Sequence, residues 1–407
     1  MWKHVKRPKS LWLIAFLVVP MLLFSLAAPP SGAAASGVAA PALAATTTPK
    51  PVVAPRRGIA KPTPKPVPTA TPDLRWEPRQ LTASLRASGA TFPNVLYQAW
   101  IQVYKQIVPG VSISYQAVGS GQGISDFIKY LTDFGGTDAA ISEARVKTEA
   151  PDALHVPMVM GAVVATYNLP GITSLRFSAA TLAGIYLGTI KRWDDRAIAA
   201  DNPSVKLPNT DITVVYRSDG SGTTSIWTDY LSKVSADWKA KVGAGTTVRW
   251  PVGVGAPGNA GVASTVKQVE GAIGYVELIY ALANKLPAAP VKNSSGNFIV
   301  PALNSVSDAA NGITYPESLA VSITNSPTAS AYPIAGFTYI LVRAQTYTDV
   351  TKAQALADFI YWGLTEGQGA SNRLGYAPLP TEARYLAMKQ LYKVRVKGQQ
   401  VFNGPIK

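Results

Sequence analysis

The hydrophobic positions of this 407-residue chain follow two recurring patterns from about residue 81 onward. Short β-rich runs that end in turn residues predict strands, at 110–121, 163–169, 211–218 and 335–344. Apolar residues at helical spacing predict helices at 93–106 and 351–364. Strands that alternate with helices are typical of an α/β fold with mostly parallel sheets.

The first 28 residues have the pattern of an export segment. Basic residues from Lys3 to Lys9 precede an apolar run from Leu11 to about Ala28. A positive segment before an apolar stretch is typical of a signal peptide. The run of about 18 residues is also just long enough to span a membrane as a helix. The pattern therefore predicts an extracytoplasmic protein and leaves open whether 1–28 is a signal peptide or an N-terminal membrane anchor.

Residues 29–80 have the composition of a basic, proline-rich linker. Eight prolines lie between residues 46 and 74, among Thr, Lys and Ala. Such a segment cannot bury a core and favours extended, polyproline-like conformers. We expect a semi-rigid spacer that holds a folded body off a surface, either merely solvated or in contact with anionic lipid or cell-wall polymer.

Most of the positive charge lies in these N-terminal segments. The chain has a net charge of +15, of which residues 1–80 carry +9, from 11 Lys/Arg and 2 Asp/Glu, and the remaining 327 residues carry +6. The body is therefore only mildly basic. It also has no nucleic-acid-binding motif, so no nucleic-acid partner is expected.

The chain has no cysteine and only two histidines, His4 and His155. This composition excludes disulfides, cysteine metal sites and a lipid-modified N-terminal cysteine. A catalytic triad built on Ser221 would have only His155 as its base in the body, and Ser221 lacks the G-x-S-x-G elbow. We therefore expect neither an enzyme nor a metal or cofactor site.

Three glycine-rich segments have the character of turns that lead from a strand into a helix: "ASGATFPNVLY" (87–97), "VGSGQGISDFI" (118–128) and "YRSDGSGTTSIW" (216–227). Glycine lets the backbone approach a ligand, and a helix start presents unpaired amides at the positive end of the helix dipole. A phosphate-like anion satisfies both features. Each turn alone is more often a plain helix cap. Three together, one with an Arg217–Asp219 couple, favour an anion site.

Asp138 in "DFGGTDAAIS" is an unusual neighbour for an anion, because a carboxylate normally repels one. It suits an anion that still carries a proton, since an ionised aspartate only accepts hydrogen bonds. Phosphate keeps at least one proton at neutral pH and sulfate has none, so Asp138 would admit phosphate and reject sulfate. From this segment alone, a loop or capping role for Asp138 is an equal alternative.

Five segments taken together resemble the PstS type of phosphate-binding protein, the extracytoplasmic receptors of ABC phosphate importers. They are "SGATFPNVLYQAW", "SYQAVGSGQGISDF", "DFGGTDAAIS", "YRSDGSGTTSIWTDYLS" and "VEGAIGYVEL", and they occur in order between about Ser88 and Ala377. The chain departs from the familiar pattern at Gln122, where a small residue is common, and in "TDAAI". Neither departure removes a ligand group.

The resemblance implies a type II periplasmic-binding-protein fold, with two α/β lobes, a ligand cleft between them and two crossover strands near 158–168 and 332–342. Lobe I would comprise 81–160 and 335–407, and lobe II would comprise 161–334. The resemblance further implies a monomer that captures inorganic phosphate and delivers it to ABC permease subunits with a separate ATPase.

The site residues implied by the resemblance come from the same turns. The first two helix starts would contribute Thr91, Phe92 and Ser120. Asp138 would accept the phosphate proton, and Arg217 would donate to phosphate while paired with Asp219. Ser221, Gly222 and Thr223 would complete the site.

Two alternatives remain open at the level of the sequence. The first is a receptor for a related oxyanion; Asp138 argues against sulfate but not against arsenate, which protonates like phosphate. The second is a phosphate-sensing or surface protein rather than a transport component.

Overall fold

The computed structural model describes residues 79–405. The predicted leader and nearly all of the predicted linker lie outside this part of the chain. Within it, no helix is both long enough and apolar enough to cross a membrane.

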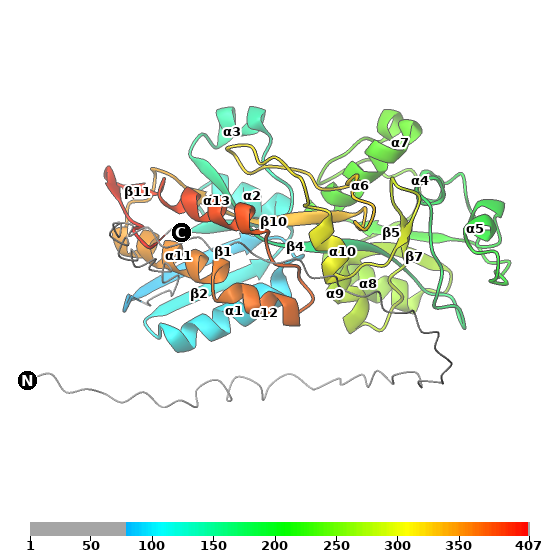
Figure 1. The fold of residues 1–407 in the computed structure, drawn as a ribbon, viewed down its shortest axis with the longest axis horizontal. Helices are drawn as coiled ribbons and strands as arrows, with labels where there is room; N and C mark the ends of the chain where they lie inside the picture. The colour runs from blue at the N-terminus through cyan, green and yellow to red at the C-terminus, as the bar shows by residue number, and fades with distance from the viewer. Residues whose placement is uncertain (1–78, 406–407) are drawn as a thin grey trace, which may run out of the picture. The chain divides into compact units, whose positions relative to one another are not determined.

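An eight-stranded sheet organises the described residues, with the strand order β2-β1-β3-β10-β4-β7-β5-β6 (Figure 1). Its strands are β1 (Ala83–Gly89), β2 (Val111–Ala117), β3 (Phe134–Thr137), β4 (Ala153–Tyr167), β5 (Thr213–Arg217), β6 (Val254–Ala256), β7 (Ala272–Glu277) and β10 (Ala335–Arg343). Two short hairpins pair β8 (Val291–Lys292) with β9 (Phe298–Ile299) and β11 (Arg395–Val396) with β12 (Gln399–Gln400).

The sheet consists of two parallel groups joined by an antiparallel centre. In the β1 group (β1, β2 and β3), β1 pairs in parallel with both neighbours. In the β5 group (β5, β6 and β7), β5 does the same. Between them β10 runs antiparallel to β3 and β4, and β4 runs antiparallel to β7. The expectation of mostly parallel sheets is therefore correct for the two groups and wrong for the centre, where β4 and β10 cross between them.

The crossover strands contain the longest buried runs of the sheet. Residues 155–167 of β4 and every residue of β10 are buried. A strand covered on both faces is expected to be continuously apolar rather than alternating. The structure thus places the two crossovers where they were expected.

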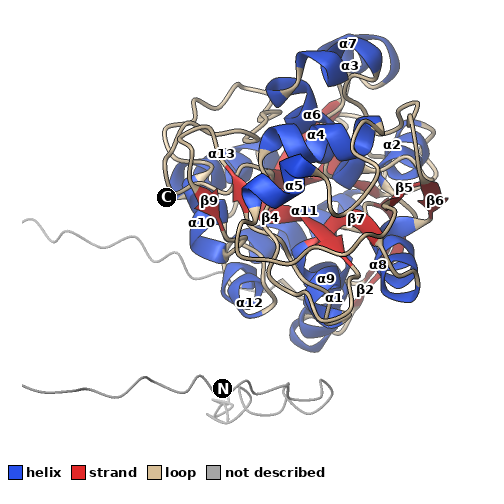
Figure 2. Ribbon diagram, turned by 90° about the vertical axis from the view of Figure 1, so that its right-hand side faces the viewer, coloured by secondary structure: helices blue, strands red, loops and turns tan. Residues whose placement is uncertain are grey.

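Helices cover both faces of the sheet. In Figures 1 and 2, α1, α8, α9 and α12 lie on one side of the strands, and α4 and α6 lie on the other. The helices are α1 (Asn94–Ile107), α2 (Ser120–Ile128), α3 (Glu143–Glu149), α4 (Ala179–Leu187), α5 (Arg196–Asp201), α6 (Gly222–Val234), α7 (Ala236–Lys241), α8 (Gly258–Gln268), α9 (Leu278–Ala283), α10 (Leu303–Asp308), α11 (Val350–Leu364), α12 (Gly367–Arg373) and α13 (Thr381–Leu391).

Helix α1 illustrates why these segments are helical. Its buried side chains are Leu96, Tyr97, Trp100, Ile101 and Tyr104, which form one stripe at the three-to-four-residue spacing of an α-helix. That stripe packs into the core, where Trp100 is fully buried. The predicted helices at 93–106 and 351–364 correspond to α1 and α11.

The end of the predicted linker is attached to the body by an ion pair. Arg79 donates through Nε to Asp358 Oδ2 at 2.7 Å and through Nη2 to Asp358 Oδ1. Asp358 belongs to α11 and is buried. This two-point contact shows where the chain joins the β1 side of the fold.

Candidate functional site

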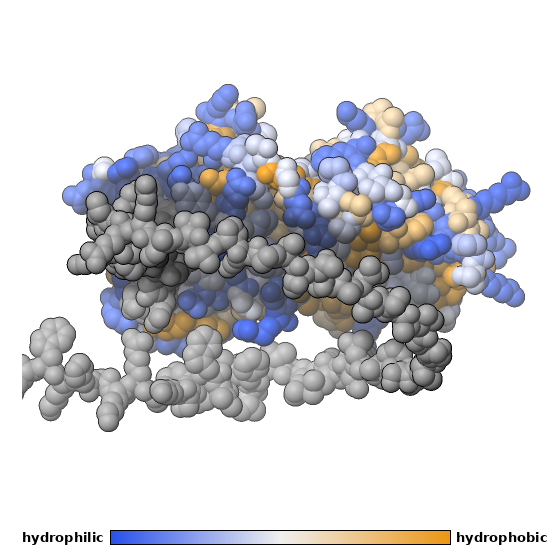
Figure 3. Space-filling view, viewed as in Figure 1, coloured by the Kyte–Doolittle hydropathy of each residue, from blue (hydrophilic) through white to orange (hydrophobic). Residues whose placement is uncertain are grey.

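Five turns that follow parallel strands lie at the seam between the two strand groups. The turns after β1, β2 and β3 contribute Thr91, Ser120 and Asp138, and those after β5 and β6 lead into α6 and α8. Ligands in open α/β sheets bind outside the carboxyl ends of such strands. The space-filling view shows a notch between the two groups, on the side of α3 and α7 (Figure 3).

The first turn is held by hydrogen bonds to its carbonyl groups. The hydroxyl of Tyr280 donates to the Thr91 carbonyl at 2.6 Å, and that of Tyr376 donates to the Phe92 carbonyl at 2.8 Å. The helix begins at Asn94, so Pro93 is its cap residue rather than its first residue. These bonds hold the carbonyl groups of the turn in place, and a helix start leaves its first backbone amides without partners inside the helix.

The second turn depends on glycine. Gly119 has φ +97°, and a Cβ there would lie 2.3 Å from Asp219 Oδ2. Only glycine fits this backbone and this close approach. Ser120, fully buried, is the first residue of α2, and its Oγ accepts from the Asp138 amide at 3.2 Å.

The third turn carries a neutralised arginine. The Arg217 side chain is 1% exposed and forms a two-point ion pair with Asp219, including Nε to Oδ1 at 2.8 Å. Burial acts to raise the pKa of Asp219, but Arg217 and the Gly258 amide outweigh it and lower the pKa below its ordinary value. Asp219 therefore stays ionised, and the pair adds little net charge to the site. Ser221 caps α6 by accepting from the Thr224 amide at 3.1 Å.

Asp138 is a buried carboxylate with an unusual pKa. Burial raises its pKa from 3.8 to about 7, and contacts with Thr338, Arg217 and Ser120 limit the rise. The Thr338 hydroxyl donates to Oδ1 at 2.7 Å. Above pH 7 Asp138 is thus mainly an ionised acceptor among groups that otherwise donate.

The two strand groups touch directly across the site. The Gly121 amide donates to the Gly220 carbonyl at 2.8 Å. A Cβ on Gly222 would lie 2.5 Å from Asp138 and 2.6 Å from Ser120 Oγ. The nine residues expected from the sequence therefore lie at these turns. Seven are linked by contacts with one another or with shared neighbours, and Phe92 and Ser221 are next to Thr91 and Gly222 in the chain.

Three residues that were not expected from the sequence also lie at this site. Asn259 at the start of α8 contacts both Thr91 and Thr223. It follows a strand and glycine-bearing turn, "GAPGN", so the rule used for the other turns would have found it. Thr338 lies within β10 and has no local signal. Glu277 is fully buried, and burial raises its pKa well above its ordinary value, which favours the uncharged form beside the site.

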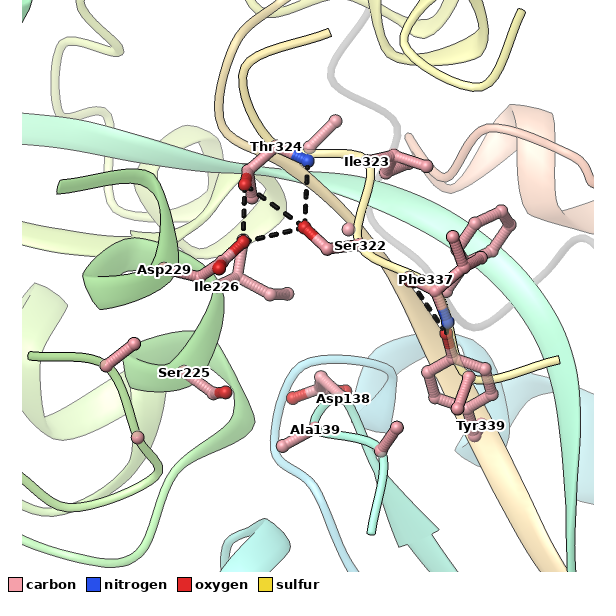
Figure 4. Close-up of a pocket in the computed structure, with 17 residues that line it drawn as sticks. Asp138, Ala139, Ser225, Ile226, Asp229, Ser322, Ile323, Thr324, Phe337 and Tyr339 are labelled. Atoms are coloured by element: carbon pink, nitrogen blue, oxygen red, sulfur yellow. Dashed lines mark hydrogen bonds between the residues drawn. The ribbon is translucent and has the colours of Figure 1, made fainter. Parts of the chain in front are cut away.

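A cavity of about 260 Å³ opens beside Asp138. Figure 4 shows Asp138 and Ser225 on one side of it and the segment Ser322–Thr324 on another. The hydroxyls of Ser322 and Thr324 both donate to Asp229. The cavity lies between the two strand groups and leads to the carboxylate that the site encloses.

His155 is engaged away from Ser221. Its Nε2 accepts from the Ile141 amide at 2.9 Å, and burial lowers its pKa to about 4. Residues 79–405 contain no cluster of three or more potential metal ligands from His, Cys, Asp and Glu. The site is thus composed of amides, hydroxyls, one ion pair and one carboxylate, an arrangement suited to holding an oxyanion.

Such a fold, with a small polar site at the seam of two α/β lobes, defines the class of periplasmic-type substrate-binding proteins. The model of the PBP superfamily domain matches residues 67–366. The chain is 39% identical over 339 residues to the phosphate-binding protein PstS of Methanocaldococcus jannaschii, covering 77% of this chain and 87% of the relative. It is 41% identical over 303 residues to PstS of Xylella fastidiosa, covering 74% and 82%. The chain therefore belongs to the family of PstS-type phosphate-binding proteins.

A solved structure shows the same fold at lower sequence identity. The high-affinity periplasmic phosphate-binding protein PfluDING, determined with bound phosphate, superposes with a TM-score of 0.62 at 24% identity. The match covers 79% of this chain and 98% of that one.

Proposed function

We propose that this chain captures inorganic phosphate outside the cytoplasm and presents it to an ABC importer. The observation that carries the proposal is Asp138, a buried carboxylate surrounded by donors beside a neutralised Arg217. A fully deprotonated anion would meet that carboxylate as a like charge, whereas a protonated phosphate can donate to it. Family membership supports the same ligand.

The geometry of the turns supports the contacts that we propose. Amides at the starts of α1, α2 and α6 point to one anion, and Arg217 adds a charge-assisted donor. The roles proposed for Thr91, Phe92, Ser120, Ser221, Gly222 and Thr223 are amide or hydroxyl donation. Asp219 orients Arg217 rather than touching the anion.

The remaining parts of the chain complete the proposal. Lobe I comprises 81–160 and 335–407, and lobe II comprises 161–334. Capture brings the lobes together, and separate permease and ATPase subunits recognise that form of a monomer. Segment 1–28 directs export, as a cleaved signal or an anchor, and 29–80 acts as the spacer.

Calorimetric titration of the purified protein, stripped of bound anion, tests the function at pH 8. Phosphate should bind one to one, arsenate should compete with it, and sulfate should be silent. A like charge at about 4 Å costs about 4 kcal/mol at an effective dielectric of 20, which is about three orders of magnitude in affinity. Absence of phosphate binding would refute the proposal.

A pair of variants tests the role of the carboxylate. Asp138→Asn should admit sulfate and weaken phosphate binding by about 10- to 100-fold, the value of a charge-assisted hydrogen bond. The control Asp229→Asn removes a carboxylate from the same cavity and should leave sulfate excluded. Sulfate binding to the unmodified protein, as tight as that of phosphate, would contradict the role of Asp138.

A further inference from the structure

Asn259 lies between the two strand groups and is fully buried. It belongs to the first turn of α8, after β6. Its Nδ2 donates to Thr91 Oγ1 at 2.8 Å and to Thr223 Oγ1 at 3.1 Å. One side-chain amide therefore contacts a hydroxyl from each side of the site.

The orientation of this amide is determined by a neighbour. The backbone amide of Glu277 donates to Asn259 Oδ1 at 3.0 Å. Because a backbone N–H can only donate, the oxygen of Asn259 must face Glu277 and its NH₂ group must face the threonines.

Both threonine hydroxyls have their acceptor capacity filled. Thr91 Oγ1 accepts from Nδ2 of Asn259 and also from its backbone amide at 3.3 Å. Thr223 Oγ1 accepts from Asn259 Nδ2 and from Arg217 Nη1 at 3.3 Å. A hydroxyl has two acceptor positions and one proton. Within residues 79–405, both hydroxyls act only as acceptors, so each has only its proton left to offer.

We propose that Asn259 is a positioning residue that holds the Thr91 and Thr223 hydroxyls as obligatory donors to the anion. At these two positions the site therefore favours oxygens that carry no proton, because a donor bonds more strongly to a charged acceptor and cannot accept a proton from the anion. The single proton of the anion is then directed to Asp138, the acceptor on the other side of the site. Asn259 in this way selects the protonation pattern of the ligand without touching it. This inference rests on the proposed phosphate-binding function.

Two double-mutant cycles read by phosphate calorimetry at pH 8 test the inference. Thr91→Val and Thr223→Val should each weaken phosphate binding by about 10- to 100-fold, as expected for hydrogen bonds to a charged group. Asn259→Leu should cause a loss of the same order, because the freed hydroxyls can turn away from the anion. In the background of either valine variant, the further loss from Asn259→Leu should be several-fold smaller.

A second variant protects the test against misfolding. Asn259→Asp keeps an oxygen for the Glu277 amide, but its carboxylate accepts from both hydroxyls and turns their protons away from the anion. The loss of phosphate affinity from Asn259→Asp should therefore be smaller in the Thr91→Val background, as for Asn259→Leu. If the added negative charge alone weakened phosphate binding, the loss would be the same in both backgrounds. Asn202→Leu is the matched control, because Asn202 is also buried and also donates two hydrogen bonds through its side chain, but it lies at α5, outside the site. It should lower the melting temperature without coupling to either threonine.

Equal losses from both Asn259 variants in all backgrounds would overturn the inference and assign Asn259 a merely structural role. If the unmodified protein binds phosphate, that result leaves the proposed function intact. If the unmodified protein does not bind phosphate, the proposed function itself fails.

Discussion

Replacing Asp138 with asparagine should stabilise the ligand-free protein at high pH. Burial raises the pKa of Asp138 from 3.8 to about 7. One pKa unit corresponds to about 1.36 kcal/mol, so ionising this carboxyl in the folded protein costs up to about 4 kcal/mol relative to the unfolded chain. Asparagine has no charge to desolvate and does not bear that cost.

The pH window follows from the direction of the change. Between pH 3.8 and about 7 the folded protein binds more protons at this residue than the unfolded chain does. The unmodified protein therefore loses stability as the pH rises through this interval, and the cost is complete above pH 7. Below pH 3.8 the carboxyl is protonated in both the folded and the unfolded state. The difference in stability that its ionisation causes between the two proteins should then vanish.

Denaturant unfolding of both proteins at pH 4, 6 and 8 measures the effect. The buffers must contain neither phosphate nor sulfate, because an anion in the site stabilises the folded state. The control is Asp237→Asn, since that side chain is 71% exposed and should show no pH-dependent gain. A gain for Asp138→Asn that is the same at pH 4 and pH 8 would refute the reasoning, as would a loss of stability at pH 8.

Two further substitutions follow from the contacts across and beside the site. Gly222→Ala places a Cβ 2.5 Å from Asp138, so the two strand groups cannot approach as closely. Because such overpacking typically costs about 1–3 kcal/mol, calorimetry should show phosphate binding weakened by about 10- to 100-fold. Gly369→Ala has open space around the added Cβ and is the control that should bind normally. His155→Ala leaves the buried Ile141 amide without its hydrogen-bond partner. Denaturant unfolding should therefore show a loss of stability of about 1–3 kcal/mol. Loss of phosphate binding in the folded variant would contradict the placement of His155 outside the site.

The sequence by itself determined the local elements and most of the candidate site. Hydrophobic periodicity identified α1 and α11, and glycine-rich turns before helices identified the segments that contain Thr91, Ser120 and Ser221. These signals are local, because helix starts and tight turns are set by a few neighbouring residues. The role proposed for Asp138 also follows from the sequence, because a carboxylate beside anion-binding turns suits an anion that still carries a proton.

The tertiary structure alone decided which distant residues complete the site. Asn259 lies 168 positions from Thr91, and Thr338 lies 200 positions from Asp138. Such pairs arise from the order of strands in the sheet. The turn before α8 marks Asn259 locally, but no local pattern encodes the partners that it contacts. The antiparallel centre of the sheet was missed for the same reason: strand direction depends on the path of the whole chain. The pKa of Asp138 likewise depends on burial by segments from both strand groups, so it exists only in the folded molecule.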